Sequence, residues 1–204
     1  MSRCPSIHTL MKALTIASVL IAAACVRDDT DAEDAAPGVA TDTGMASMDH
    51  SAMAMNRGPV RDADHEFLRM MSDHHQGLIE MASAAMSKGT TPQVQGDAHK
   101  LHTAQEAEMK QMVDMLRTAY DEELHPMIMA SNKAMNDTLQ QKSGAEYDRT
   151  FYRMVVDHHR EGMRMMDNFK ARVQRAEVRQ MIDKMRADQQ REIKEFEAKA
   201  TRQG

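Results

Sequence analysis

Two copies of a short motif contain the side chains best suited to binding a metal. Asp73-His74-His75 is followed, at a shift of 84 positions, by Asp157-His158-His159. Neutral imidazole binds copper, zinc and nickel, and a carboxylate either supplies an oxygen ligand or orients an imidazole through its second nitrogen. A solvated charge on a helix surface explains each aspartate equally well. The paired histidines therefore predict a metal site, with Asp73 and Asp157 as further candidate ligands.

Methionine accompanies both motifs. The chain has 22 methionines and 10 histidines among 204 residues. Met70 and Met154 lie one turn before the histidine pairs, and Met81, Met165 and Met166 follow them. A methionine stripe at helical spacing usually packs a core, but the thioether is also a soft, neutral ligand that selects Cu(I). The repeated pairing of the two ligand types favours copper, as Cu(I), Cu(II) or both.

The segment 26–60 carries the same ligand types where no core exists to be packed. It is acidic near its start, contains Pro37 and Gly38, and has too little apolar surface to fold, so we predict a flexible tether. Met48, His50 and Met53 lie within six residues of one another and can wrap a copper ion without prior folding.

Residues 1–25 have the features of an export signal. Arg3 and Lys12 precede a mostly apolar run of 12 residues, which is too short to span a bilayer. Three alanines then precede Cys25, as in a bacterial lipobox, so we expect Cys25 to be lipidated. Ordinary secretion with cleavage nearby is the alternative, and Met1 or Met11 could be the true start. The prediction is an exported protein of the periplasm or outer envelope, bound to the membrane only through this anchor.

The region 61–204 shows helical periodicity and an internal duplication. The pattern predicts helices over about 61–88, 92–120, 145–172 and 175–200, with room for a short helix within 126–141. The shift of 84 also aligns Gln105 with Gln189 and Glu108 with Glu192. Each repeat is a hairpin that cannot cover its own apolar stripe. We therefore predict an all-α four-helix bundle, with repeats at 61–120 and 144–201 joined by a connection at 121–143.

Helical geometry assigns the motif histidines to faces. His74 and His158 point into the bundle with the large apolar residues, while His75 and His159 lie on the flanks. Whether His74 and His158 meet depends on their helices being neighbours and on the two residues lying at equal depth.

The second predicted helix adds candidate ligands to the first repeat. His102 faces inward with Met109, and His99 lies on the edge of the same face. The second repeat has Asp183 and Arg186 at the two histidine positions, so a site that uses this helix is not duplicated.

The doubled Asp-His-His motif, with Met81, Met165 and Met166 after it, resembles the domain-of-unknown-function 305 family over about residues 61–200. That family is related to the ferritin-like four-helix bundles and includes exported copper-binding proteins of the CopM type. The run Met48-Asp49-His50-Ser51-Ala52-Met53 is similar to segments of periplasmic copper-resistance proteins. The resemblance implies copper binding or copper tolerance outside the cytoplasm.

Composition excludes other chemistry. The net charge of −5 and an aromatic content of 3% disfavour a nucleic-acid partner. Cys4 and Cys25 are the only cysteines, so the mature domain has no thiolate ligand and no cysteine nucleophile.

We predict a non-catalytic copper buffer, scavenger or chaperone, with copper ions and copper efflux or resistance proteins as its partners. An envelope interaction or scaffold module without metal is the alternative, because methionine surfaces adapt to varied partners. A ferritin-like di-metal oxidase is less well supported, because such bundles use Glu-x-x-His pairs and the four predicted long helices contain none.

Overall fold

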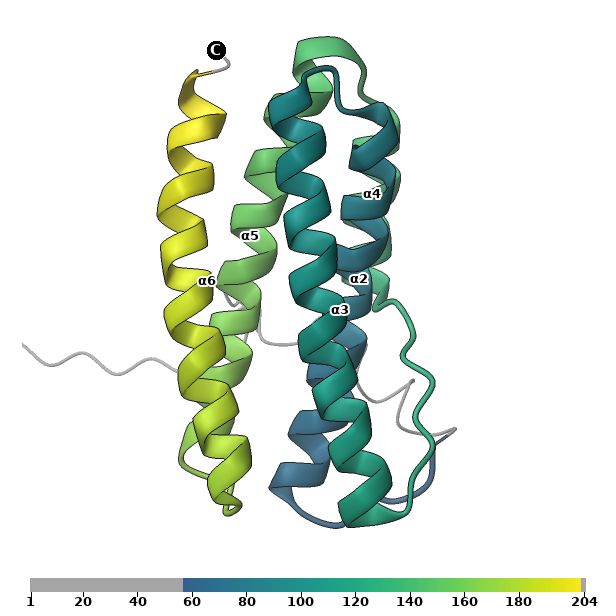
Figure 1. Cartoon of the computed structure of the whole chain (residues 1–204). Coiled ribbons are helices and arrows are strands. Elements are labelled where there is room, and N and C mark those ends of the chain that lie inside the picture. The colour runs from purple at the N-terminus through teal and green to yellow at the C-terminus, as the bar shows by residue number, and fades with distance from the viewer. Residues whose placement is uncertain (1–56, 203–204) are drawn as a thin grey trace, which may run out of the picture. The chain divides into compact units, whose positions relative to one another are not determined.

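The computed structural model describes residues 57–202, and all the regular secondary structure in this range is helical. The helices in this range (Figure 1) are α2 (Ala63–Lys88), α3 (Pro92–Tyr120), α4 (Ala130–Gln140), α5 (Gly144–Lys170) and α6 (Ala176–Arg202). The predicted all-α class is confirmed, and α4 is the short helix expected in the connection. None of the helices described here is long and apolar enough to cross a membrane. The predicted export signal 1–25, including Cys25, lies outside the described residues.

Local sequence signals set the helix boundaries. The Asp62 carboxylate accepts a hydrogen bond of 2.8 Å from His65 N at the start of α2. Thr91 Oγ1 accepts one of 3.2 Å from Val94 N at the start of α3, where Pro92 takes the first helical position. These contacts satisfy N–H groups that have no partner within their own helix.

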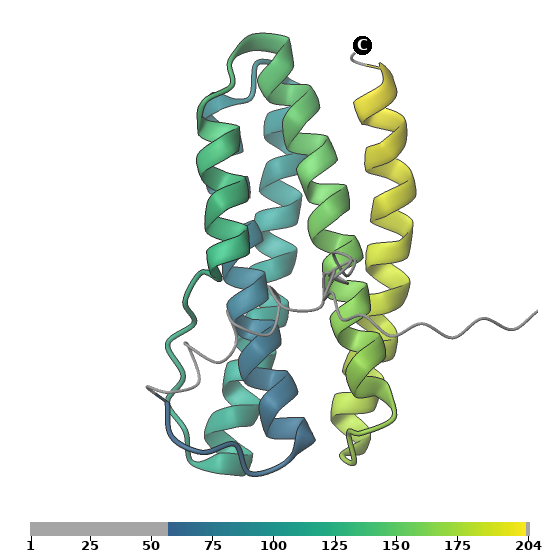
Figure 2. The same cartoon turned by 180° about the vertical axis from the view of Figure 1, so that it is seen from behind.

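The two hairpins, α2–α3 and α5–α6, exchange equivalent contacts. Asp64, at the start of α2, accepts hydrogen bonds of 2.9 and 3.0 Å from the backbone N–H groups of Gln174 and Arg175, between α5 and α6. Asp148, its counterpart at the start of α5, accepts one of 2.9 Å from Thr90 N, between α2 and α3. Helices α2 and α5 therefore run antiparallel (Figures 1 and 2), and the hairpins are related by an approximate two-fold axis.

Removing one of these aspartates is expected to destabilise the fold. Asp148→Ala removes a buried carboxylate that accepts hydrogen bonds from both the N–H and the hydroxyl of Thr90, so the free energy of unfolding should fall by about 1–3 kcal/mol in urea denaturation. The matched control is Asp157→Ala, because the Asp157 side chain is 65% exposed and pairs with Arg160 on the surface. That control should change stability by about 0.5 kcal/mol at most. Equal losses in the two variants would contradict the capping role of Asp148.

Helix α4 covers the outer face of α2. Asn132 and Asn136 donate to the carbonyl oxygens of His74 and Gly77, at 3.3 and 3.2 Å. The approach is close because Gly77 has no side chain: a Cβ there would lie 2.5 Å from Asn132 Cβ. Helix α2 is therefore buried on nearly all sides along its middle.

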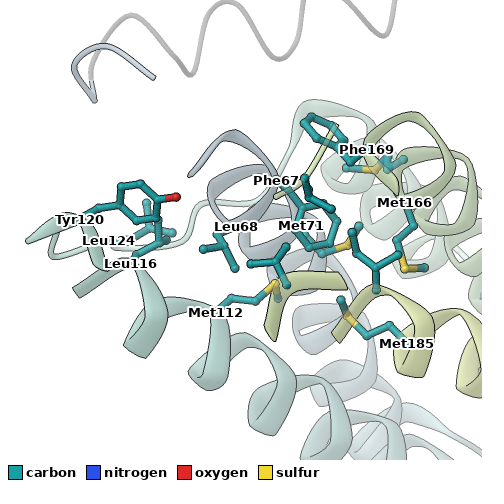
Figure 3. Close-up of a cluster of buried hydrophobic side chains, with 14 of the residues drawn as sticks. Phe67, Leu68, Met71, Met112, Leu116, Tyr120, Leu124, Met166, Phe169 and Met185 are labelled. Carbon is teal, nitrogen blue, oxygen red and sulfur yellow. The ribbon is translucent and has the colours of Figure 1, made fainter. Parts of the chain in front are cut away.

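Two apolar clusters fill the bundle. The first, around Phe67 and Phe169, joins the beginnings of α2 and α6 to the ends of α3 and α5 (Figure 3). The second, around Phe151 and Tyr152, lies toward the other ends of the long helices. Along α2 and α5 the Asp-His-His motifs fall between the two clusters, so the fold places the candidate ligands at mid-height.

Candidate metal centre

Four imidazoles form a row across the middle of the bundle, and we call them the imidazole row: His75, His74, His158 and His159. Successive ring centroids lie 6.4, 3.8 and 6.0 Å apart. All four residues have an exposed fraction of 0%. The inner rings come from α2 and α5 and meet because the two-fold relation places equivalent positions at one depth.

The two inner rings are stacked, at an interplanar angle of 17°. His158 Nε2 donates a hydrogen bond of 3.0 Å to the carbonyl oxygen of His74, so its Nδ1 keeps a lone pair. Burial lowers the pKa of His74 well below its usual 6.5, and the nearby His158 lowers it further. Burial also lowers the pKa of His158 to about 3. Both rings are neutral near pH 7, which is the form that binds metals.

Polar atoms without partners surround these rings. In the described chain no hydrogen bond reaches either ring nitrogen of His74, His158 Nδ1, the amide group of Gln189 or Gln105 Oε1, and all are buried. Gly162 leaves room for two of them: a Cβ there would lie 2.9 Å from Gln189 Oε1 and 3.0 Å from His74 Nε2. Buried polar groups are normally satisfied, so such a group of unsatisfied atoms indicates a ligand.

The outer imidazoles face carboxylates. His75 Nδ1 lies 2.9 Å from Met71 O and its Nε2 lies 3.1 Å from Glu108 Oε2, so both of its ring nitrogens already have partners. His159 Nε2 lies 2.7 Å from Glu192 Oε2 but out of line for a hydrogen bond, and its Nδ1 is unpartnered. Burial raises the pKa of Glu108, but its hydrogen bond with His75 and the charge of Lys184 outweigh this effect and lower it.

Sequence reasoning placed His75 and His159 on the flanks and did not assign the residues that cover them. Those flanks are closed by α3 and α6, whose glutamates face the two rings. The signal was present in the duplication, which preserves both members of the Gln105/Gln189 and Glu108/Glu192 pairs. Polar residues that recur at inward positions of both repeats mark a buried polar site.

The two motif aspartates have different environments. Asp73 is buried and accepts hydrogen bonds of 2.5 Å from Arg57 and 2.8 Å from Met127 N. It fastens the end of the tether and the α3–α4 connection to α2. Asp157 is exposed and lines an open surface cavity of about 680 Å³ with Met154 and Arg160. Neither contact orients an imidazole.

The remaining predicted ligands are scattered. Met165 and Met166 are buried in the first cluster, and Met70 and Met109 are half-buried at its edge. The second cluster contains Met81 and has Met154 at its edge. His99 is exposed, and His102 is half-buried and lies 3.3 Å from the carboxylate of Glu106. Met48, His50 and Met53 lie outside the described residues.

The two inner imidazoles of the row are therefore a preformed pair of neutral donors, and the row is not a closed coordination shell. Among residues 57–202, no three His, Cys, Asp or Glu side chains are grouped so that they could hold a metal ion as they stand. Lone pairs lie in the ring planes, so stacked rings must rotate before two nitrogens can share one ion. The unpartnered amide of Gln189 lies close to His74, and the inner imidazoles remain the principal donors.

Comparisons with known proteins agree with this architecture. The model of the family described as Domain of unknown function (DUF4142) matches residues 49–199. CopM in its Cu(I)-bound form is 27% identical, with a TM-score of 0.59, over 68% of this chain and 96% of CopM. CopM in its Cu(II)-bound form is 26% identical, with a TM-score of 0.60 and the same coverage.

A DUF305 protein from Streptomyces coelicolor shares the fold, with 20% identity and a TM-score of 0.63 over 70% of this chain and 93% of its own. No curated protein matches the chain in sequence. The resemblance to DUF305 and CopM-type proteins is confirmed.

Proposed function

Because the chain belongs to the DUF4142 family and resembles copper-bound CopM in structure, we propose that it is a copper-binding protein without catalytic activity. The observation that carries the proposal is the buried, stacked pair His74 and His158, in which both ring nitrogens of His74 and Nδ1 of His158 have no hydrogen-bond partner in the described chain. The proposed ligands are these imidazoles, together with methionines of the bundle and of the tether.

Copper suits these donors better than zinc. Structural zinc sites are almost always four-coordinate and use thiolate, imidazole or carboxylate. Residues 57–202 contain no cysteine, and no carboxylate is hydrogen-bonded to the inner imidazoles. Methionines pack in the apolar clusters on both sides of the row, and thioether sulfur selects Cu(I). Neutral donors of this kind also resist oxidation better than cysteine would outside the cytoplasm.

The burial of the row favours storage over rapid transfer. An ion bound between residues of 0% exposure can leave only when the helices separate locally. We propose a buffer or scavenger, exported by the signal at 1–25 and anchored at Cys25. In this proposal, the tether collects copper and exchanges it with efflux or resistance proteins.

A metal titration tests the proposal. The mature chain should retain more than one copper ion against a modest competing chelator, as counted by native mass spectrometry. A second chain lacking residues 26–56 keeps Arg57, and with it the contact to Asp73, and should retain the copper of the bundle while losing that of the tether. Retention of no copper by either chain would reject the function.

A further inference from the structure

Methionine is concentrated in one of the two apolar clusters. Within residues 57–202, six of the fifteen buried members of the first cluster are methionine, against one of fourteen in the second. Partly buried methionines surround both clusters: Met70, Met109, Met115, Met163 and Met181 around the first, and Met86, Met135 and Met154 around the second, so the difference lies in the buried members. The two clusters are of similar size and fill equivalent ends of the bundle. The need for apolar volume therefore does not explain the difference in methionine content.

Four of these methionines come one from each long helix. Met71 lies on α2, Met112 on α3, Met166 on α5 and Met185 on α6, and each has an exposed fraction of at most 1%. All four belong to the first cluster, and Figure 3 shows them among its other buried side chains. We call this group the thioether cluster.

The duplication provides an internal control for packing. At the shift of 84, the counterparts of Met71, Met112, Met166 and Met185 contain no sulfur: they are, in the same order, Val155, Phe196, Ala82 and Leu101. All four counterparts are buried in the second cluster. The same positions of the same fold are thus filled by ordinary apolar residues at the other end. Packing at these four positions therefore does not require methionine.

The surroundings suit a monovalent cation. Glu108 lies one turn before Met112 on α3 with a carboxylate that is only 15% exposed, and it shares its negative charge with His75 at 3.1 Å and Lys184 at 3.5 Å. The half-buried methionines Met70, Met109, Met163 and Met181 border the first cluster and offer a thioether path from its edge to its centre.

We propose that Met71, Met112, Met166 and Met185 form a second copper site of the bundle, specific for Cu(I) and for its analogue Ag(I). The site is made of neutral sulfur donors and is separate from the imidazole row. This inference rests on the proposed copper-binding function and adds a ligand set and an oxidation-state preference to it. Soft thioethers bind Cu(I) and have little affinity for Cu(II).

Substitution by leucine tests the site because it removes sulfur at nearly constant volume. The full chain carrying Met71→Leu, Met112→Leu, Met166→Leu and Met185→Leu is titrated with Cu(I) under reducing conditions beside the wild-type chain. The variant should retain about one Cu(I) fewer per chain against the same chelator and lose part of the Cu–S signal in X-ray absorption. Cu(II) capacity should stay unchanged.

A Met135→Leu variant is the control, since Met135 lies on α4 at the edge of the other cluster and is not one of the candidate ligands. Circular dichroism establishes that both variants are folded, and a double variant, Met112→Leu with Met185→Leu, replaces the quadruple one if that chain does not fold. Equal Cu(I) retention by the variant and the wild type overturns the thioether site alone. Failure of the wild type to retain any copper overturns the proposed function.

Discussion

Leucine in place of both inner imidazoles, His74→Leu with His158→Leu, is expected to abolish the tightest Cu(II) site of the bundle. Loss of a residue that only orients a metal ligand already weakens binding about 10–100-fold, so loss of two ligands should exceed about 100-fold. Competition with a chelator measures the affinity, and electron paramagnetic resonance reports the loss of imidazole nitrogen around Cu(II). His125→Leu is the control, because that side chain is exposed and lies outside the row.

The same double substitution is expected to leave the metal-free fold intact or to strengthen it. A buried polar group without a partner costs about 1–3 kcal/mol, and leucine removes three such ring nitrogens. The hydrogen bond from His158 to the His74 carbonyl is lost, which offsets part of the gain. Urea denaturation should therefore show an unchanged or higher free energy of unfolding. If the variant unfolds much more easily and still binds Cu(II) as tightly as the wild type, then the row is a structural core and not a metal site.

Acid is expected to destabilise the metal-free protein well before its carboxylates titrate. Above about pH 6.5, His74 and His158 are neutral in both the folded and the unfolded chain and contribute no pH dependence. Below it, the unfolded chain binds a proton on each ring, whereas the folded chain does not until the pH approaches the folded pKa, about 3 for His158. Unfolding therefore takes up protons, and stability falls by about 1.4 kcal/mol per pH unit for each ring.

Urea denaturation between about pH 6 and pH 5 measures this effect, because free carboxylates titrate mostly below that range. The two rings should lower the free energy of unfolding of the wild-type chain by about 2.7 kcal/mol per pH unit as the pH falls. The doubly substituted chain should lack this contribution. Identical slopes in the two chains would show that the inner imidazoles are solvated in solution and would remove the basis for neutral donors at acidic pH.

The bundle tolerates the polar row because apolar packing lies on both sides of it. Each end of the bundle contains a cluster of fully buried side chains, and the reciprocal contacts of Asp64 and Asp148 fasten each hairpin to the turn of the other. A set of buried, unsatisfied donors in this position costs stability that apolar residues would not. Its presence in both repeats is the physical reason to assign it a function.

Much of the fold could be predicted because helical periodicity and duplication are local signals. The spacing of apolar residues placed the long helices within a few residues of their observed bounds, and Thr91-Pro92 marked the start of α3. The same spacing directed His74 and His158 inward, since a residue's angle around a helix follows from its position in the chain. The abundance of methionine and histidine was enough to indicate soft metal ligands.

Helical spacing is enough to predict which residues point into the bundle, but the packing of the helices sets which groups those residues contact. The motif aspartates are identical in the two repeats, yet Asp73 is buried by Arg57 and the α3–α4 connection, while Asp157 has no counterpart of either segment and stays at the surface. The stacking of His74 on His158 likewise depends on the depth at which two antiparallel hairpins dock. Helix geometry acts over a few residues, whereas burial and partners depend on segments far apart in the chain, so they could be established only in the folded protein.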